Sequence, residues 1–263
     1  MQKISRIIIL VLFALAPLTS FGWGVLGHRI TGQIAWNHLT PKAKLRITKI
    51  LGTESLALAT TWADFIRSDS SYSALSSWHF IDFDSSASAA DIRSYLKTDT
   101  ATDLYTKTKF IIGQLKGHKL SADKQRYYLK LLIHFVGDIH QPLHVGEKNN
   151  AGGNKIKVNW FNTPVNLHSI WDESLINFQQ LSYTEYTAAI DHSTAAERHK
   201  WEHTPMTEWF VESFLISQQV TAEVTPDAKL SYRYNFDHIA TINQRLLIGG
   251  LRLATLLNDL FGY

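Results

Sequence analysis

A histidine and an aspartate stand four residues apart inside a strongly apolar segment of this chain. His134 and Asp138 lie within residues 131–139, and a helix would place both side chains on one face, one turn apart. Ser121 is a suitable N-cap for this segment, and Pro142 ends it. Burying an imidazole and a carboxylate among Leu, Ile, Phe and Val is costly unless both find partners. The segment therefore predicts a core helix that carries either a buried His–Asp hydrogen bond or a metal site.

The same spacing occurs a second time, in His168 and Asp172, and His144 lies between the two pairs. Imidazole nitrogen and carboxylate oxygen together suit Zn²⁺. One His-x-x-x-Asp pair is common on ordinary helix surfaces, but two such pairs in apolar sequence favour a metal centre. Further candidate ligands stand upstream, some of them beside aromatic residues: His28, Asp64 and His79.

Helical spacing of apolar residues dominates the rest of the chain. Residues 155–161 alternate instead, and they predict a short strand that pairs near Val165. We therefore predict an all-α fold, a single mostly helical domain with at most a short β-hairpin. The predicted helices cover residues 26–39, 41–51, 56–67, 102–115, 122–136 with an extension to 141, 175–189, 206–220 and 236–260.

Residues 1–22 have the pattern of a secretory signal peptide. Lys3 and Arg6 form a positive start, residues 7–16 are an unbroken apolar run, and small residues precede a cleavage point after Gly22. The apolar run is short for a membrane span. We expect a mature domain of residues 23–263 that is secreted or periplasmic, without a stable membrane anchor.

The composition limits how the mature chain can work. It has no cysteine, so an exported domain must rely on its core or on bound metal. The formal charge is +3, and loss of Lys3 and Arg6 would leave about +1. A nearly neutral protein does not bind phosphate backbones tightly through its overall charge. Any activity on nucleic acid must therefore come from a local site.

Cleavage after Gly22 would make Trp23 the first residue, five positions before His28. A free α-amino group has a pKa of about 7.7–8.0, so it can ligate zinc near neutral pH. The carbonyl oxygen of the same residue could close a five-membered chelate. Trp23 and His28 are therefore candidate ligands.

Several motifs follow one another in order along residues 23–263. They are Trp23-Gly24-x-x-Gly27-His28, Trp62-Ala63-Asp64, His79-Phe80-Ile81-Asp82, His134-Phe135-Val136-Gly137-Asp138-Ile139-His140-Gln141-Pro142-Leu143-His144, Gly152-Gly153-Asn154-Lys155, Asn166-Leu167-His168-Ser169-Ile170-Trp171-Asp172 and Gly249-Gly250-Leu251-Arg252-Leu253-Ala254. This ordered set resembles the S-one/P-one family of zinc-dependent, single-strand-specific nucleases. The likeness covers essentially the whole mature chain.

The resemblance implies a mostly helical domain that holds three Zn²⁺ ions in a cleft, so residues 23–263 would form a trinuclear zinc nuclease domain. The implied ligands are Asp64, His79, His134 and Asp138 for one zinc; the Trp23 amine and carbonyl, His28 and a bridging Asp138 for its neighbour; and His144, His168 and Asp172 for the third.

The resemblance also implies a reaction. A hydroxide held by two zinc ions would attack phosphorus in line, with the third zinc at the leaving 3′-oxygen. Arg67, three residues after Asp64, would stabilise charge on the phosphoryl oxygens; its alternative role is an ordinary surface arginine. Together with Asp64 and Asp138, Arg67 completes the predicted catalytic set. The implied substrates are single-stranded DNA and RNA, cleaved to 5′-nucleotides, and 3′-nucleotides; we expect a monomer.

Single-strand preference has a physical reason, because an unpaired base costs least to bring into a pocket. By resemblance, Phe80 would stack on this base and Asp82 would hydrogen-bond its edge, beside Ala151, Gly153 and Asn154. The loop over residues 145–151 is one residue longer than in a fungal family member, and it ends in the small Ala151. Base preference is therefore open.

Two other functions remain alternatives. A zinc phospholipase C acting on phosphatidylcholine shares the implied fold and metal site, and Phe80 with Asp82 does not exclude a choline-like headgroup. A non-catalytic exported zinc-binding protein is the more remote alternative, because metal storage would not need Arg67. We interpret His192, His199 and His203 as a solvated helix face. His140 is expected to support neighbouring ligands or the core.

Overall fold

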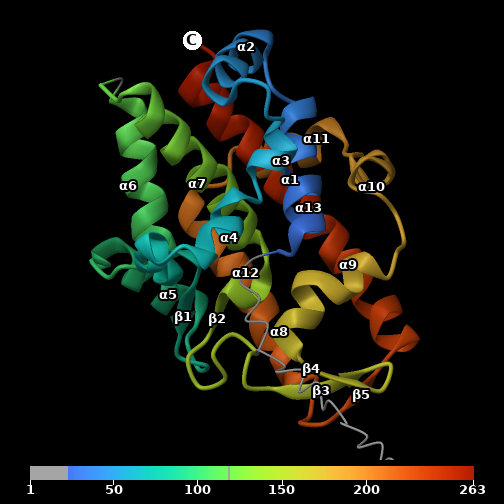
Figure 1. Cartoon of the computed structure of the whole chain (residues 1–263). Coiled ribbons are helices and arrows are strands. Elements are labelled where there is room, and N and C mark those ends of the chain that lie inside the picture. The colour runs from blue at the N-terminus through green and yellow to red at the C-terminus, as the bar shows by residue number, and fades with distance from the viewer. Residues whose placement is uncertain (1–22, 118) are drawn as a thin grey trace, which may run out of the picture.

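The protein is described by a computed structural model that covers residues 23–117 and 119–263. Helices make up most of it, and short strands lie at one end (Figure 1). The predicted all-α class is confirmed. The predicted signal peptide lies outside the described residues. The helices are α1 (Val25–Asn37), α2 (Pro41–Leu51), α3 (Leu56–Ala59), α4 (Trp62–Phe65), α5 (Ala89–Thr98), α6 (Leu104–Lys116), α7 (Ala122–His140), α8 (Leu167–Ser169), α9 (Leu175–Asn177), α10 (Tyr183–Ile190), α11 (Ala195–Glu202), α12 (Met206–Ala222) and α13 (Tyr232–Phe261).

Helix α7 runs through the middle of the molecule and packs against α1, α4, α6, α12 and α13 (Figure 1). Ser121 caps it as predicted, because its Oγ accepts a hydrogen bond from the backbone N–H of Lys124 at 3.4 Å. Every residue from Leu129 to His140 is buried. The helix stops just before Pro142, which begins the 3₁₀ turn η3 (Pro142–His144). The predicted core helix with its buried His134 and Asp138 is therefore confirmed.

Two predicted helices are broken. Residues 56–67 form α3, α4 and the 3₁₀ turn η1 (Ile66–Ser68) rather than one helix. The break leaves the carbonyl of Thr60 free to accept a hydrogen bond from His134 Nδ1 at 2.6 Å. Residues 175–189 are also discontinuous, because Gln180 adopts a φ of 56° and Ser182 begins α10 with its own cap.

Helix α5 was not among the predicted elements, and α11 was expected only as the solvated helix face around His199 and His203, although each helix carries a local start signal. Ser88 and Asp91 form a reciprocal capping box at the start of α5. Thr194 and Glu197 do the same for α11. A Ser or Thr followed three residues later by an acidic residue satisfies two otherwise free backbone N–H groups. Both helices are therefore determined locally.

The strands form two small sheets. The predicted hairpin is present, with β3 (Lys157–Trp160) antiparallel to β4 (Thr163–Asn166), and β5 (Lys229–Leu230) lies parallel to β3. A second pair goes beyond the single hairpin that we predicted: β1 (Ile81–Phe83) lies parallel to β2 (Val145–Glu147), with Asp82 opposite Gly146. A 3₁₀ segment, η2 (Ser70–His79), leads into β1. This parallel pair brings two distant parts of the chain together.

The buried apolar residues fall into two clusters. The first surrounds α7 and contains Phe135 and Val136. The second joins α1 to α13 and contains Trp23 and Trp171. His134 and Asp138 belong to the helix of the first cluster, while Asp172 follows a tryptophan of the second. The candidate ligands therefore lie where the two clusters meet. Within residues 23–117 and 119–263, no helix combines the length and apolarity that crossing a membrane requires.

Candidate metal centre

The predicted His and Asp ligands converge in the fold. They form three groups in which the ligand atoms lie within 4.8 Å of one another, and all of these side chains except Asp64 are buried. The groups overlap, because His134 belongs to two of them. They are His79, His134 and Asp138; His28, Asp64 and His134; and His144, His168 and Asp172.

Asp138 lies at the centre of the first group. Its Oδ2 is 3.1 Å from His79 Nδ1 and 3.3 Å from His134 Nε2. Its other oxygen, Oδ1, is 3.4 Å from Nε2 of His28. One carboxylate therefore faces two groups of imidazoles, which is the geometry of a ligand shared between two neighbouring metal ions.

The second group is built around the stacked rings of His28 and His134, whose centroids are 3.9 Å apart. The two oxygens of Asp64 point to both rings, at 4.0 Å from His28 Nε2 and 3.8 Å from His134 Nε2. Asp64 Oδ1 also accepts a hydrogen bond from Arg67 Nη1 at 3.1 Å. The predicted catalytic arginine therefore stands at the edge of this group.

The third group joins η3 to the segment that follows β4. Asp172 lies in a π-helical turn, η4 (Ile170–Ser174), and its Oδ2 is 3.3 Å from His168 Nε2. Its Oδ1 is 3.7 Å from His144 Nε2. Single π-helical turns are rare and recur at functional sites. Here the turn directs a buried carboxylate at two imidazoles.

Backbone carbonyls fix the orientation of three imidazoles. Nδ1 of His134 donates to Thr60 at 2.6 Å, Nδ1 of His144 to His79 at 2.7 Å, and Nδ1 of His168 to Gly152 at 2.6 Å. In the neutral ring, the opposite nitrogen then carries a lone pair. Second partners of this kind orient metal-bound histidines in proteins.

These orientations create a conflict that a cation resolves. Nε2 of His144 and Nε2 of His168 lie 3.1 Å apart, so when both rings are neutral each presents a lone pair to the other. Nε2 of His134 is also 3.1 Å from Nδ1 of His79, which no backbone carbonyl of the described residues orients. Asp138 Oδ1 and Asp172 Oδ2 are buried without hydrogen-bond partners. This donor set of imidazole nitrogens and carboxylate oxygens fits zinc.

The charges within the cluster shift its pKa values. Burial alone would raise the pKa of Asp138, but the charges of His134 and His144, and the nearby imidazoles of His28 and His79, hold it well below its usual range. Burial lowers the pKa of His144, yet Asp138 and Asp172 outweigh this effect and raise it to about 9. The field at His144 therefore favours a positive charge, whether a proton or a metal ion supplies it.

Trp23 lies beside the candidate ligands. Its side chain is fully buried, and the backbone N–H of Gly24 donates to the carbonyl of Asp172 at 2.8 Å. A Cβ added to Gly137 would lie 2.7 Å from Nδ1 of His28 and 3.7 Å from Cδ1 of Trp23. Glycine at 137 therefore lets α1 approach α7 closely enough for His28 to reach Asp138.

Among the expected base-pocket residues, Asp82 is brought near the loop that carries Ala151, Gly153 and Asn154. Phe80, Asp82, Ala151 and Asn154 are half-buried, and Gly153 is buried. Asp82 lies opposite Gly146, where an added Cβ would meet Gly152 Cα at 2.5 Å and Asp82 Oδ1 at 3.0 Å. The β1–β2 pairing therefore places Asp82 beside the 151–154 loop.

This loop has an unusual backbone. Ala151, Gly152 and Gly153 have φ values of 53°, 55° and 80°. Asn154 Nδ2 donates to the carbonyl of Ala151 at 3.0 Å, which ties the turn to itself. Gly152 in turn accepts the Nδ1 hydrogen of His168. The loop thus connects the expected base pocket to the third group of ligands.

One supporting residue was missed by the sequence reasoning. Gln141 Nε2 donates to Asp172 Oδ1 at 2.5 Å, and its Oε1 accepts from the backbone N–H of Leu143. Gln141 therefore holds Asp172 and η3 together. Its place between His140 and Pro142 in the longest motif was the available signal, but its partner Asp172 is distant in sequence.

The histidines that we set aside take no part in the three groups. His199 and His203 stack on each other at the end of α11, with centroids 4.2 Å apart. His140 donates from Nδ1 to the carbonyl of Val136 and accepts from Arg252 Nη1 at 3.1 Å. Burial, together with the charges of Arg245 and Arg252, holds the pKa of His140 well below its usual range. His140 is therefore a neutral core histidine.

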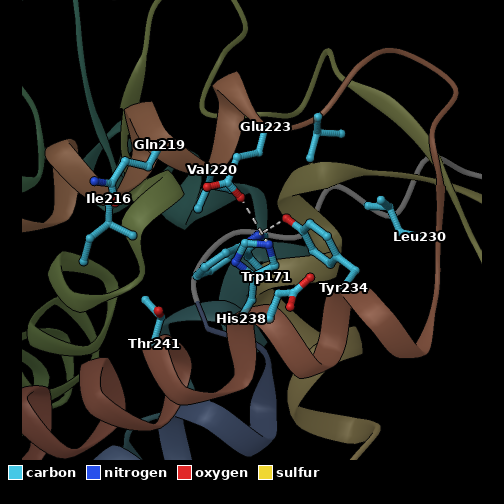
Figure 2. Close-up of a pocket in the computed structure, with 11 residues that line it drawn as sticks. Trp171, Ile216, Gln219, Val220, Glu223, Leu230, Tyr234, His238 and Thr241 are labelled. Carbon is cyan, nitrogen blue, oxygen red and sulfur yellow. Dashed lines mark hydrogen bonds and ion pairs between the residues drawn. The ribbon is translucent and has the colours of Figure 1, made fainter.

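A separate cavity of about 470 Å³ lies against Trp171, the residue before Asp172 (Figure 2). Trp171 Nε1 donates to the hydroxyl of Tyr234 at 2.9 Å, and Glu223 lies 3.4 Å from His238. Its charged lining residues are Glu223 and Asp237, and no Lys or Arg lines it. A carboxylate-lined cavity repels phosphate, so phosphate chemistry is assigned to the three His/Asp groups instead.

Comparisons with known proteins identify the family of this chain. The family model described as S1/P1 Nuclease matches residues 23–262. Endonuclease 2 of Arabidopsis thaliana is 29% identical over 98% of this chain and 97% of its own length. Nuclease P1 of Penicillium citrinum is 29% identical over 91% of this chain and 98% of its own length.

A third relative, Nuclease S1 of Aspergillus oryzae, is 34% identical over 62% of this chain and 57% of its own length. The match to the family model covers nearly all of the described residues. The protein is accordingly a nuclease, a hydrolase that acts on phosphodiester bonds of nucleic acid. On this evidence the chain belongs to the S1/P1 nuclease family.

Proposed function

We propose that this chain is an exported, zinc-dependent endonuclease that cleaves single-stranded DNA and RNA to 5′-nucleotides and also removes phosphate from 3′-nucleotides. The observation that carries the proposal is the 3.1 Å approach of His144 Nε2 to His168 Nε2 beside the buried Asp172. A metal cation between the neutral rings would relieve their repulsion. A cluster of cations in turn suits a phosphodiester substrate.

The ligand assignment follows the three groups of side chains. Asp64, His79, His134 and Asp138 would hold one zinc ion, and Asp138 would be shared with a second that also takes His28 and the amine and carbonyl of Trp23. His144, His168 and Asp172 would hold a third. Bound zinc supplies a Lewis acid and lowers the pKa of water to about 7. Residues 1–22 would be the signal peptide that exposes the Trp23 amine on cleavage.

The protein's own residues orient the substrate. Arg67, held by Asp64 at 3.1 Å and about one-third exposed, would donate to a non-bridging phosphoryl oxygen. Phe80 would stack on a base whose edge is read by Asp82, with Ala151, Gly153 and Asn154 forming the opposite wall. A base held in a duplex must first unpair to enter this pocket, which favours single strands. We expect the enzyme to act as a monomer.

The test compares substrates on protein that begins at Trp23. A single-stranded oligonucleotide, the same sequence as a duplex, 3′-AMP and phosphatidylcholine would each be incubated with enzyme before and after zinc removal and after zinc is restored. We expect zinc-dependent cleavage of the single strand and of 3′-AMP, with 5′-phosphate ends on the oligonucleotide products. Cleavage of phosphatidylcholine alone would replace the proposal with phospholipase C activity, and zinc binding without hydrolysis would replace it with metal storage.

A further inference from the structure

Phe65 is the most exposed of the large apolar side chains that the structure describes. Its side chain is 80% exposed, and no other aromatic ring of the described residues packs on it. Burial of a phenylalanine side chain stabilises the folded state, and Phe65 makes little of this contribution. Isolated exposed apolar residues are ordinary on protein surfaces, so the location of Phe65 decides whether it has a role.

Phe65 lies at the rim of the metal centre. It is the last residue of α4 and directly follows Asp64, whose carboxylate faces His28 and His134. Helix α4 packs on α7 near the middle of the molecule (Figure 1). Consecutive helical residues point about 100° apart. Asp64 therefore faces the metal ligands while Phe65 stands in solvent beside them.

We infer that Phe65 is a stacking platform for an unpaired base next to the cleaved phosphate, distinct from the pocket of Phe80 and Asp82. The inference rests on the proposed function and assigns it a second contact to the strand. Consecutive Cα atoms are about 3.8 Å apart, so a phosphate at the metal centre leaves the adjoining nucleotide within reach of the ring. An exposed ring offers a face to any base and reads no hydrogen-bond pattern, so this contact is tolerant of sequence.

We expect the enzyme to prefer strands in which the nucleotide next to the cleaved phosphate carries a base. Stacking of a base on an aromatic side chain changes affinity roughly 5- to 100-fold when the aromatic residue becomes alanine. This contact is made before and during the reaction, so its loss should raise KM and leave kcat nearly unchanged. A duplex cannot use the platform, because its bases are already stacked and paired.

The experiment uses zinc-loaded mature enzyme and single-stranded oligonucleotides in which every linkage but one is non-hydrolysable. One strand carries bases on both sides of the cleaved linkage. A second strand is abasic on the 5′ side of that linkage, and a third is abasic on the 3′ side. Phe65→Ala should raise KM roughly 5- to 100-fold on the fully based strand. On the strand that is abasic on the side contacted by Phe65, the KM of wild type should rise by the same factor. On that strand Phe65→Ala should cause no further rise in KM.

The matched control is Phe236→Ala, because Phe236 is 74% exposed on α13 and is not adjacent in sequence to any metal ligand. This variant should cleave every strand like wild type. Phe65→Trp should retain or improve KM, which a purely structural role would not predict. Equal KM values for Phe65→Ala and wild type on the fully based strand would overturn the inference while leaving the nuclease intact. A wild-type enzyme that cleaves no strand would instead refute the proposed function.

Discussion

Nε2 of His144 and Nε2 of His168 face each other at 3.1 Å, while the Nδ1 atom of each ring donates to a backbone carbonyl. The accepting carbonyls belong to His79 and Gly152, which lie far apart in the sequence. Asp172 completes the group at 3.3 Å from His168 Nε2. This arrangement is stable when positive charge lies between the rings, so metal binding and folding should be coupled.

Asp138→Asn should remove the charge that is shared between the first two groups. The amide keeps the size of the side chain but loses the negative charge that faces His28, His79 and His134. We expect the content of bound zinc to fall and kcat/KM to fall by about 10²–10³-fold, because a metal ion contributes several kcal/mol of transition-state stabilisation. Metal analysis and initial rates check this, with His203→Ala as the control. Full zinc content with normal rates would exclude Asp138 as a bridging ligand.

One additional residue before Trp23 should remove most activity. Trp23 is fully buried and the N–H of the next residue is bonded to Asp172, so an extension cannot move away without disturbing the site. A peptide nitrogen in place of the free amine is a poor zinc ligand. The measurement compares rates and zinc content for protein that begins at Trp23 and protein with an added alanine, each verified by mass spectrometry. A fully active extended protein would show that the Trp23 amine binds no metal.

Gly137→Ala should weaken both the fold and the second group of ligands. The new Cβ would lie 2.7 Å from His28 Nδ1, and overpacking of this kind costs about 1–3 kcal/mol. Displacement of His28 should also lower zinc affinity. Chemical denaturation and zinc titration measure the two effects.

Gly113→Ala provides the matched control, because Gly113 also lies in a helix and its added Cβ would meet nothing within 4 Å beyond the backbone of that helix. The free energy of unfolding of this variant should rise by about 0.5–1 kcal/mol, because alanine has a higher helix propensity than glycine. If both variants behaved alike, close contact between α1 and α7 would not be the reason for glycine at 137.

Asp82→Asn should stabilise the zinc-free protein at pH 7–8 and have little effect at pH 4. Burial raises the pKa of Asp82 to about 6, although the charges of His144 and Lys148 oppose the shift. A carboxyl group whose pKa is raised by folding favours the native state when protonated. Its contribution is full below the unfolded pKa of about 3.9 and is lost as pH rises through about 6. At neutral pH, the free energy of unfolding of the zinc-free variant should therefore exceed that of wild type by at most about 3 kcal/mol.

The same titration should affect substrate binding. The Asp82 carboxylate accepts hydrogen bonds from a base, and protonation at low pH removes part of this capacity. KM for a base with exocyclic N–H donors should therefore fall as pH rises through about 6 in wild type, and Asp82→Asn should flatten this profile. An unchanged pH profile in Asp82→Asn would mean that Asp82 does not contact the base.

Local sequence determined most of the helices and explains α5, which we missed. Ser121 and Thr40 cap α7 and α2 with hydrogen bonds to nearby N–H groups. Capping boxes at Ser88 and Thr194 mark α5 and α11 equally clearly. Such signals act over three or four residues, so they can be recognised without knowledge of the fold.

The sequence by itself determined the helical class, the buried His134–Asp138 pair and, through ordered motifs, the residues that meet at the metal centre. Tertiary structure alone decided the break between α3 and α4. At this break the Thr60 carbonyl accepts a hydrogen bond from His134, which lies on the distant helix α7. It also decided the parallel pairing of Asp82 with Gly146 and the exposure of Phe65. Spacing along a chain specifies which face a residue occupies, but only packing of distant segments specifies what lies opposite that face.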